Sequence, residues 1–125
     1  MKTLLFIAGG GALGAVLRYL MSSGIYHWFG REFPYGTLAV NVLGSLAIGL
    51  LSILLIEKFS LSQDVKLGLV VGLLGAFTTF STFSWETLHL LEQGLLQKAF
   101  LNVLLNVTLC VLAAWTGAQW ARSMV

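Results

Sequence analysis

The sequence predicts an all-α membrane protein with four transmembrane helices. Hydrophobic residues make up 58% of the chain and charged residues 10%, whereas soluble domains carry about 25% charged residues. The apolar residues gather in four segments, each close to the ~20 residues that a helix needs to cross a bilayer. Backbone groups in lipid must pair within the protein, and the alternating pattern of a membrane barrel is absent, so helices are expected.

Loops that hold most of the charge separate the four segments. The segments are residues 3–25, 35–56, 65–91 and 99–121. The first is too long for a signal-peptide core and contains Arg18, so we expect a permanent helix. The second begins after Pro34, whose missing N–H costs nothing in a first helical turn. Together they predict a single transmembrane domain over residues 1–125, without room for a soluble catalytic domain. The net charge of +2 gives no reason to expect nucleic acid as a partner.

The basic residues are divided almost evenly between the two sides of the membrane. The side with both termini and the middle loop holds four of them, Lys2, Lys58, Lys66 and Arg122. The other side holds Arg31, Lys98 and, if it snorkels, Arg18. A clear excess is needed to fix the topology of a membrane protein. The sequence therefore permits insertion in both orientations, or dual topology.

Small residues recur at a spacing of four in three of the helices. The pairs are Gly10 and Gly14, Ser45 and Gly49, and Gly68 and Gly72. Such faces let membrane helices approach closely. We expect the helices to pack tightly against one another or against a second copy. Four helices alone make a thin bundle, which favours an oligomer.

Side chains that could support catalysis are scattered along the chain. His27 and His89 are isolated, and no group of Cys, His, Asp and Glu has metal-ligand spacing. The single Cys110 excludes an intramolecular disulfide. Glu86 precedes His89 by three residues, so a local pair is expected at that helix end. The sequence argues against an enzyme.

Polar residues form stripes within the second and fourth segments. Asn41 and Ser45 share one helix face, and Asn102, Asn106 and Cys110 share another. Polar side chains in a membrane must find a partner or line a wet path. Hydrogen bonding between helices is the ordinary explanation for each of them. The alternative is a path for an anion, because an amide offers two donors and no acidic residue interrupts the stripes.

The third segment contains a run that is unusual for a lipid-facing helix, residues 72–84. Gly75 followed by the β-branched Thr78 and Thr79 predicts a break near the middle of this helix. Carbonyls at such a break lose their helical donors. Irregular backbone at this depth is stable only where it is buried in protein or faces water or an ion.

Aromatic and hydroxyl side chains follow the predicted break. Phe80 and Phe83 project from one side of the helix, and Ser81 and Thr82 lie toward the other. The edge of a phenyl ring is positive, so it can contact an anion without binding it tightly. Packing in the core is the alternative for a phenylalanine pair at this spacing.

These motifs resemble those of the Fluc (CrcB) fluoride channels of bacteria and archaea, and the resemblance covers essentially the whole chain. It rests on Arg18-Tyr19, Pro34-x-Gly36-Thr37-Leu38 leading to Asn41, the run Gly75-x-x-Thr78-Thr79-Phe80-Ser81-Thr82-Phe83-Ser84-x-Glu86, and Asn102 to Asn106. The resemblance implies a dual-topology antiparallel homodimer in the plasma (inner) membrane. It implies passive export of fluoride through two pores, and so fluoride resistance.

The resemblance also implies roles for individual residues. A structural Na⁺ at the dimer centre falls on backbone oxygens of Gly75 and Thr78. The fluoride pore falls on Asn41, Phe80 and Phe83, with Ser81 and Thr82 nearby. Further pore or vestibule candidates are Asn106, Cys110, Arg18 and Glu86, although Arg18 could simply snorkel and Glu86 could lie at a solvated helix end. Cys110 and Leu109 depart from the Ser and Gly that the family usually has there.

Two other functions would fit a chain of this size. Small multidrug exporters are also short, dimeric and helical, but they depend on a membrane-embedded Glu in the first helix. This chain has no acid there and carries Arg18 instead, which would repel a cation. A membrane scaffold without transport activity would have no need for the Thr, Ser and Phe run.

Overall fold

The computed structural model describes all 125 residues, and almost all of them are helical. The elements are α1 (Lys2–Phe29), α2 (Tyr35–Glu57), α3 (Gln63–Leu67), the π-helical η1 (Gly68–Leu74), α4 (Gly75–Phe77), α5 (Phe80–Glu92) and α6 (Leu96–Ser123). The segments α3 to α5 together make the third span, so four helices are long and apolar enough to cross a membrane. The prediction of an all-α protein with four spans is confirmed; α2 begins at the predicted residue 35, and every other span end lies one to four residues beyond its predicted place.

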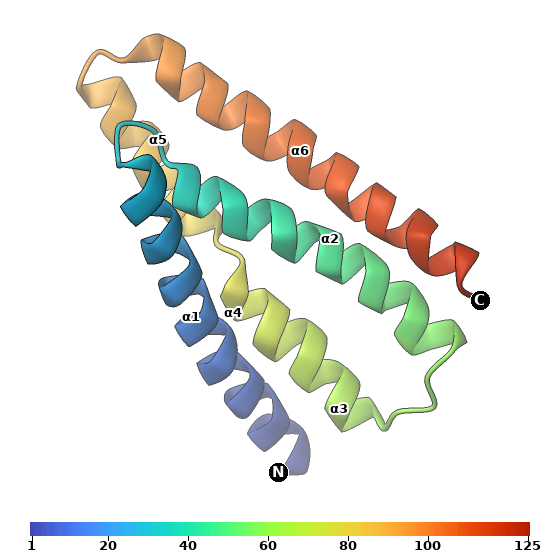
Figure 1. Cartoon of the computed structure of the whole chain (residues 1–125). Helices are drawn as coiled ribbons and strands as arrows, with labels where there is room; N and C mark the ends of the chain where they lie inside the picture. Colours follow the sequence, from blue (N-terminus) through green and yellow to red (C-terminus); the bar gives the residue numbers. More distant parts are fainter.

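The helices associate as two pairs. The helix α1 packs along η1 and α4, and α2 packs along α6. Figure 1 shows α2 between α6 on one side and the pair of α1 and α4 on the other. The two pairs lie close together near α5 and diverge toward the N-terminus and C-terminus. The third span packs against α2 through η1, α4 and α5, and α5 also packs against α6.

Glycines permit the close crossing within each pair. A Cβ atom on Gly10 or Gly14 would overlap the backbone oxygens of Gly68 and Leu73. The predicted glycine faces of the first and third spans therefore pack against each other within one chain. In the other pair, a Cβ atom on Gly117 would overlap the carbonyl of Leu46.

The predicted break in the third span is confirmed, but it is narrower than expected. Thr78 and Thr79 have extended backbone, with φ and ψ of −81° and 157° and of −150° and 113°. Gly75 keeps helical angles of −61° and −37°, so the break lies at Thr78 and Thr79 and does not include Gly75. The π-helical turn of η1 just before the break was not predicted.

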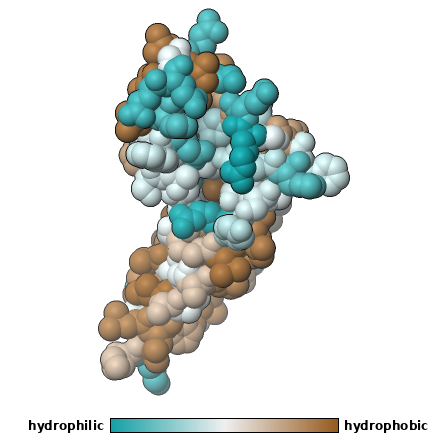
Figure 2. All heavy atoms as spheres, turned by 90° about the vertical axis from the view of Figure 1, so that its left-hand side faces the viewer, coloured by the Kyte–Doolittle hydropathy of each residue, from teal (hydrophilic) through white to brown (hydrophobic).

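Much of the apolar surface of one chain is uncovered. Only 21 of 125 residues are buried. Figure 2 shows hydrophobic side chains over the lower part of one face and hydrophilic ones at the upper end. The loops between α1 and α2 and between α5 and α6 lie at that upper end (Figure 1). The long apolar part suits the lipid core, and the polar end suits the membrane surface.

Candidate functional site

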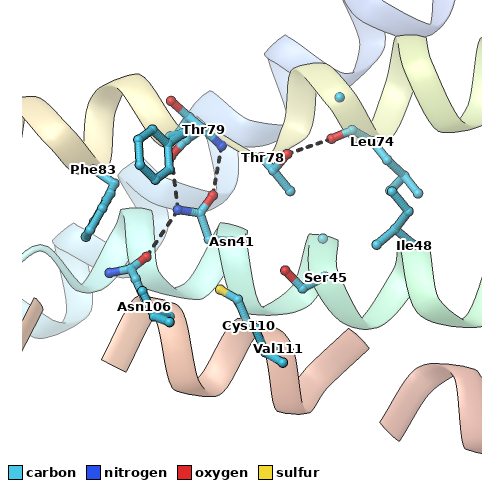
Figure 3. A pocket seen from close by; sticks show the side chains of 14 residues that line it. Asn41, Ser45, Ile48, Leu74, Thr78, Thr79, Phe83, Asn106, Cys110 and Val111 are labelled. Atoms are coloured by element: carbon cyan, nitrogen blue, oxygen red, sulfur yellow. Dashed lines mark hydrogen bonds between the residues drawn. The ribbon is translucent and has the colours of Figure 1, made fainter. Parts of the chain in front are cut away.

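A cavity of about 460 Å³ lies beside the break, between α2 and α6. Seven of the predicted site residues line it: Asn41, Gly75, Thr78, Phe80, Phe83, Asn106 and Cys110. Ser45, which shares a helix face with Asn41, lines it as well. Figure 3 shows side chains from α2, from α6 and from the break converging on this space. None of the lining residues is charged.

Asn41 holds the broken backbone of the third span. The N–H of Thr79 donates to Asn41 Oδ1 at 2.8 Å, and Asn41 Nδ2 donates to the Thr79 carbonyl at 3.0 Å (Figure 3). One side chain on α2 thus satisfies both backbone groups of a residue that has left the helical pattern. Asn41 and Thr79 are both buried. The break is a fixed part of the fold because the backbone groups of Thr79, which have no helical partner, are paired with Asn41.

The amide of Asn41 also connects α2 to α6. Its Nδ2 donates to Asn106 Oδ1 at 3.2 Å, while Asn106 Nδ2 donates to the Oδ1 and the backbone oxygen of Asn102, both at 2.9 Å. Hydrogen bonding between helices, the ordinary explanation for these residues, is therefore present. The role of Asn41 and Asn106 toward an anion stays a prediction.

Two carbonyls at the break lack their usual helical donors. The N–H of Thr79, four residues after Gly75, donates to Asn41 instead. The N–H of Thr82, four residues after Thr78, donates to Thr79 Oγ1 at 3.1 Å. The carbonyls of Gly75 and Thr78 are thereby free of helical donors at the wall of the cavity. Backbone oxygens of this kind are ligands that a hard cation accepts.

The two phenylalanines differ in their surroundings. Phe83 is buried, whereas Phe80 is 77% exposed in the single chain. Their ring centroids lie 5.3 Å apart and the ring planes meet at 56°. Both rings line the cavity. Phe80, an apolar side chain near the middle of a span, projects from the bundle toward lipid or another molecule.

Ser81 and Thr82 lie at the start of α5, outside the cavity lining. Thr79 Oγ1 donates to Thr82 Oγ1 at 2.9 Å, and it lies 3.4 Å from Ser81 Oγ. Thr79 also caps α5 by accepting from the N–H of Thr82. The hydroxyl groups predicted near the pore are thus gathered around the side chain of Thr79.

Glu86 belongs to a separate polar cluster. Tyr26 on α1 donates to Glu86 Oε2 at 2.8 Å, and the Thr37 hydroxyl donates to Glu86 Oε1. The predicted local pair with His89 is wrong, because His89 contacts Gln93. A second cavity contains Glu86 and Tyr26.

The second cavity lies toward the polar loops, and two cationic side chains, Arg31 and Lys98, line it. The Arg31 guanidinium carbon lies 4.5 Å from the centroid of the Tyr26 ring. Arg18, a predicted vestibule residue, is half-exposed on α1 and lines neither of these cavities.

Three residues of these sites were missed in the sequence. Thr79 was predicted only as part of the break, although it is bonded to both Asn41 and Thr82. Tyr26 and Thr37 were not assigned to any site. The carboxylate of Glu86 within a membrane span was the available signal, since such a group requires donors from neighbouring helices.

The comparison with known families decides the identity of the chain. A model described as "CrcB-like protein, Camphor Resistance (CrcB)" matches residues 5–118. The chain belongs to the CrcB family. The resemblance predicted from the motif of the third span is confirmed.

Several CrcB relatives carry the name "Fluoride-specific ion channel FluC". The protein of Geobacter sulfurreducens is 51% identical over 124 residues, covering 99% of this chain and 100% of its own length. That of Shewanella denitrificans is 52% identical over 125 residues, covering all of both chains. The protein of Methylococcus capsulatus is 53% identical over 122 residues, or 98% of this chain, but the match spans only 54% of that relative. The named activity is ion conduction, so membership of the CrcB family confirms that the chain is not an enzyme.

Proposed function

We propose that the chain is a fluoride-selective channel that lets fluoride leave the cytoplasm passively and so confers fluoride resistance. The cavity beside the break carries this proposal. It brings together Asn41, Asn106 and the rings of Phe80 and Phe83, and it contains no charged residue. An acid-free wall does not repel an anion, and a wall without fixed cations does not hold it too tightly to leave. The names of the relatives support fluoride as the ion.

The phenylalanine rings would contact fluoride through their positive edges. Phe83 fixes one side of the cavity because it is buried, and Phe80 stands beside it at 5.3 Å between ring centroids. Ser81 and Thr82 contact Thr79, which lines the cavity, and their hydroxyls would help to replace water around a strongly hydrated ion. Cys110 would contribute a weaker donor farther along.

The functional unit would be an antiparallel homodimer of dual topology in the bacterial or archaeal plasma membrane. The near-even division of basic residues supports insertion in both orientations. The exposure of Phe80 in the middle of a span supports a second copy, because a lining residue of a closed pore cannot face lipid. A single chain with 21 buried residues also has little interior in which to enclose a pathway.

A structural Na⁺ would lie where the two breaks meet at the dimer centre. The carbonyls of Gly75 and Thr78 fit this ion because their helical donors are engaged elsewhere. The two-fold axis would supply each carbonyl twice. The ion would neutralise these dipoles and so stabilise the meeting of the two breaks. Side-chain carboxylates are not required for such a site.

Growth of a bacterium that lacks its own fluoride exporter tests this function. Expression of the chain should restore growth in fluoride medium, and expression of the Phe83→Ile variant should not. Resistance to cationic drugs without resistance to fluoride would instead favour a multidrug exporter. Membrane insertion without either resistance would overturn transport altogether.

A further inference from the structure

The amides at the cavity are the start of a longer chain of hydrogen bonds. Beyond Asn106, the Nδ2 of Asn102 donates to Thr87 Oγ1 at 2.9 Å. The Thr87 hydroxyl then donates to the carbonyl of Phe83 at 2.8 Å. This series of hydrogen bonds therefore runs from the break through α2 and α6 and returns to α5. Asn102 is fully buried, with 0% exposure.

Backbone groups fix the direction of this chain. The Thr79 N–H can only donate, so the Asn41 atom that faces it must be Oδ1, and Asn41 Nδ2 must face the Thr79 carbonyl. The Asn102 carbonyl can only accept, which fixes the amide of Asn106 in the same way. At the far end the Phe83 carbonyl requires Thr87 to donate, so the Thr87 oxygen accepts from Asn102. No single amide can turn over without placing two donors or two acceptors face to face.

All the side-chain N–H groups of Asn41 and Asn106 already donate hydrogen bonds within the protein. The two N–H groups of Asn41 donate to Thr79 and Asn106, and the two of Asn106 both donate to Asn102. An anion in the cavity can therefore accept an amide N–H only if one of these hydrogen bonds breaks. The longest link, 3.2 Å between Asn41 Nδ2 and Asn106 Oδ1, is the weakest and opens at the lowest cost. It can open cleanly only while Asn106 stays fixed by Asn102.

We propose that Asn102 and Thr87 are positioning residues for the anion pathway. Neither lines the cavity. They hold the amides so that the Asn41 N–H that faces Asn106 is the donor handed to the anion. Bonds in such a network polarise one another, which extends the effect of Thr87 to Asn41. The identity of the anion as fluoride rests on the proposed function.

Substitutions at Thr87 test this proposal. Thr87→Val keeps the shape of the side chain but removes the acceptor for Asn102 and the donor to Phe83. Thr87→Ser keeps both. Thr116→Val is the matched control, because the Thr116 hydroxyl makes the same kind of bond to its own helix, at 2.7 Å to Leu112, on an exposed face. Should Thr87→Val fail to yield a stable protein, Thr87→Cys replaces it, since a thiol is a weak donor and acceptor.

The first readout is independent of transport. Side-chain ¹⁵N–¹H resonances of Asn41 and Asn106 in the full chain, in detergent without fluoride, should shift in Thr87→Val and stay in place in Thr87→Ser and Thr116→Val. The second readout is fluoride efflux from liposomes. It should fall about fivefold in Thr87→Val, the factor given by one net hydrogen bond of about 1 kcal/mol. Efflux from Thr87→Ser and Thr116→Val should stay within about twofold of the unmodified chain, well under the loss of one such bond.

The two readouts separate this inference from the proposed function. Amide shifts with no fluoride efflux from the unmodified chain would support the hydrogen-bond chain and refute the channel. Unshifted Asn41 and Asn106 resonances in Thr87→Val would overturn the positioning role, whatever the efflux. An equal loss of efflux in Thr87→Ser or Thr116→Val would also overturn it.

Discussion

Replacement of Asn41 by leucine should lower the stability of the protein at the break in the third span. Leucine has the same branching as asparagine but offers no hydrogen bond. The change leaves the N–H and the carbonyl of Thr79 without partners, and Thr79 is only 7% exposed. Each unpartnered buried group costs about 1–3 kcal/mol, so the two together cost roughly 2–6 kcal/mol. Whole domains are stable by only about 5–15 kcal/mol, so this loss is a large fraction of the total.

Thermal unfolding of the purified protein in detergent measures this effect. The midpoint should fall by about 10 °C or more in Asn41→Leu. Ser45→Ala is the matched control, because Ser45 lines the same cavity one turn farther along α2 without holding the backbone of the break. Its midpoint should remain at that of the unmodified chain. An Asn41→Leu protein with an unchanged midpoint would refute the conclusion that this amide holds the break.

Four further outcomes are expected. In Phe80→Ile and Phe83→Ile the loss of the positive ring edge should abolish most of the fluoride efflux while the proposed dimer persists on size exclusion, and unchanged efflux in both would mean that the rings only pack. Gly117→Val should destabilise the protein by about 1–3 kcal/mol or more through overlap with α2, which thermal unfolding would measure. The control Gly24→Ala should not, because an added Cβ atom there meets no neighbour. Equal unfolding midpoints for the two variants would contradict the close crossing of α2 and α6. A single Cys placed in a loop of a Cys110→Ser background should be labelled from both sides of intact cells; labelling from one side only would exclude dual topology. Strict removal of Na⁺ should abolish efflux, and full activity without it would refute the proposed ion.

The four spans could be predicted from the sequence because a bilayer imposes one simple requirement. Each span needs a long apolar run, and nine of the twelve charged residues of this chain lie outside such runs. Close helix packing could also be predicted from the glycine spacing, since Gly10 and Gly14 lie against the backbone of the third span. The break was predicted from residue type as well. Its exact place was not, because Gly75 tolerates helical angles when its neighbours favour them.

The contacts of the site depended on tertiary structure, which local spacing does not contain. Asn41 and Thr79 are 38 residues apart, and Tyr26 and Glu86 are 60 residues apart. The predicted pair of Glu86 and His89 failed for the same reason, because a carboxylate in a membrane took donors from two other helices. The stripe of asparagines was recognised and hydrogen bonding between helices was expected for it, but spacing along one helix could not name the partners on the other spans.

Fluoride efflux from liposomes that contain the purified full chain tests the central claim most directly. A fluoride electrode records release after a potassium ionophore removes the electrical barrier, and a chloride electrode records the control. A fluoride channel should give rapid, passive release of fluoride with chloride retained, and the Phe83→Ile variant should lose that release. Liposomes that retain fluoride although they contain the folded protein, or that release chloride equally well, would contradict the proposed function.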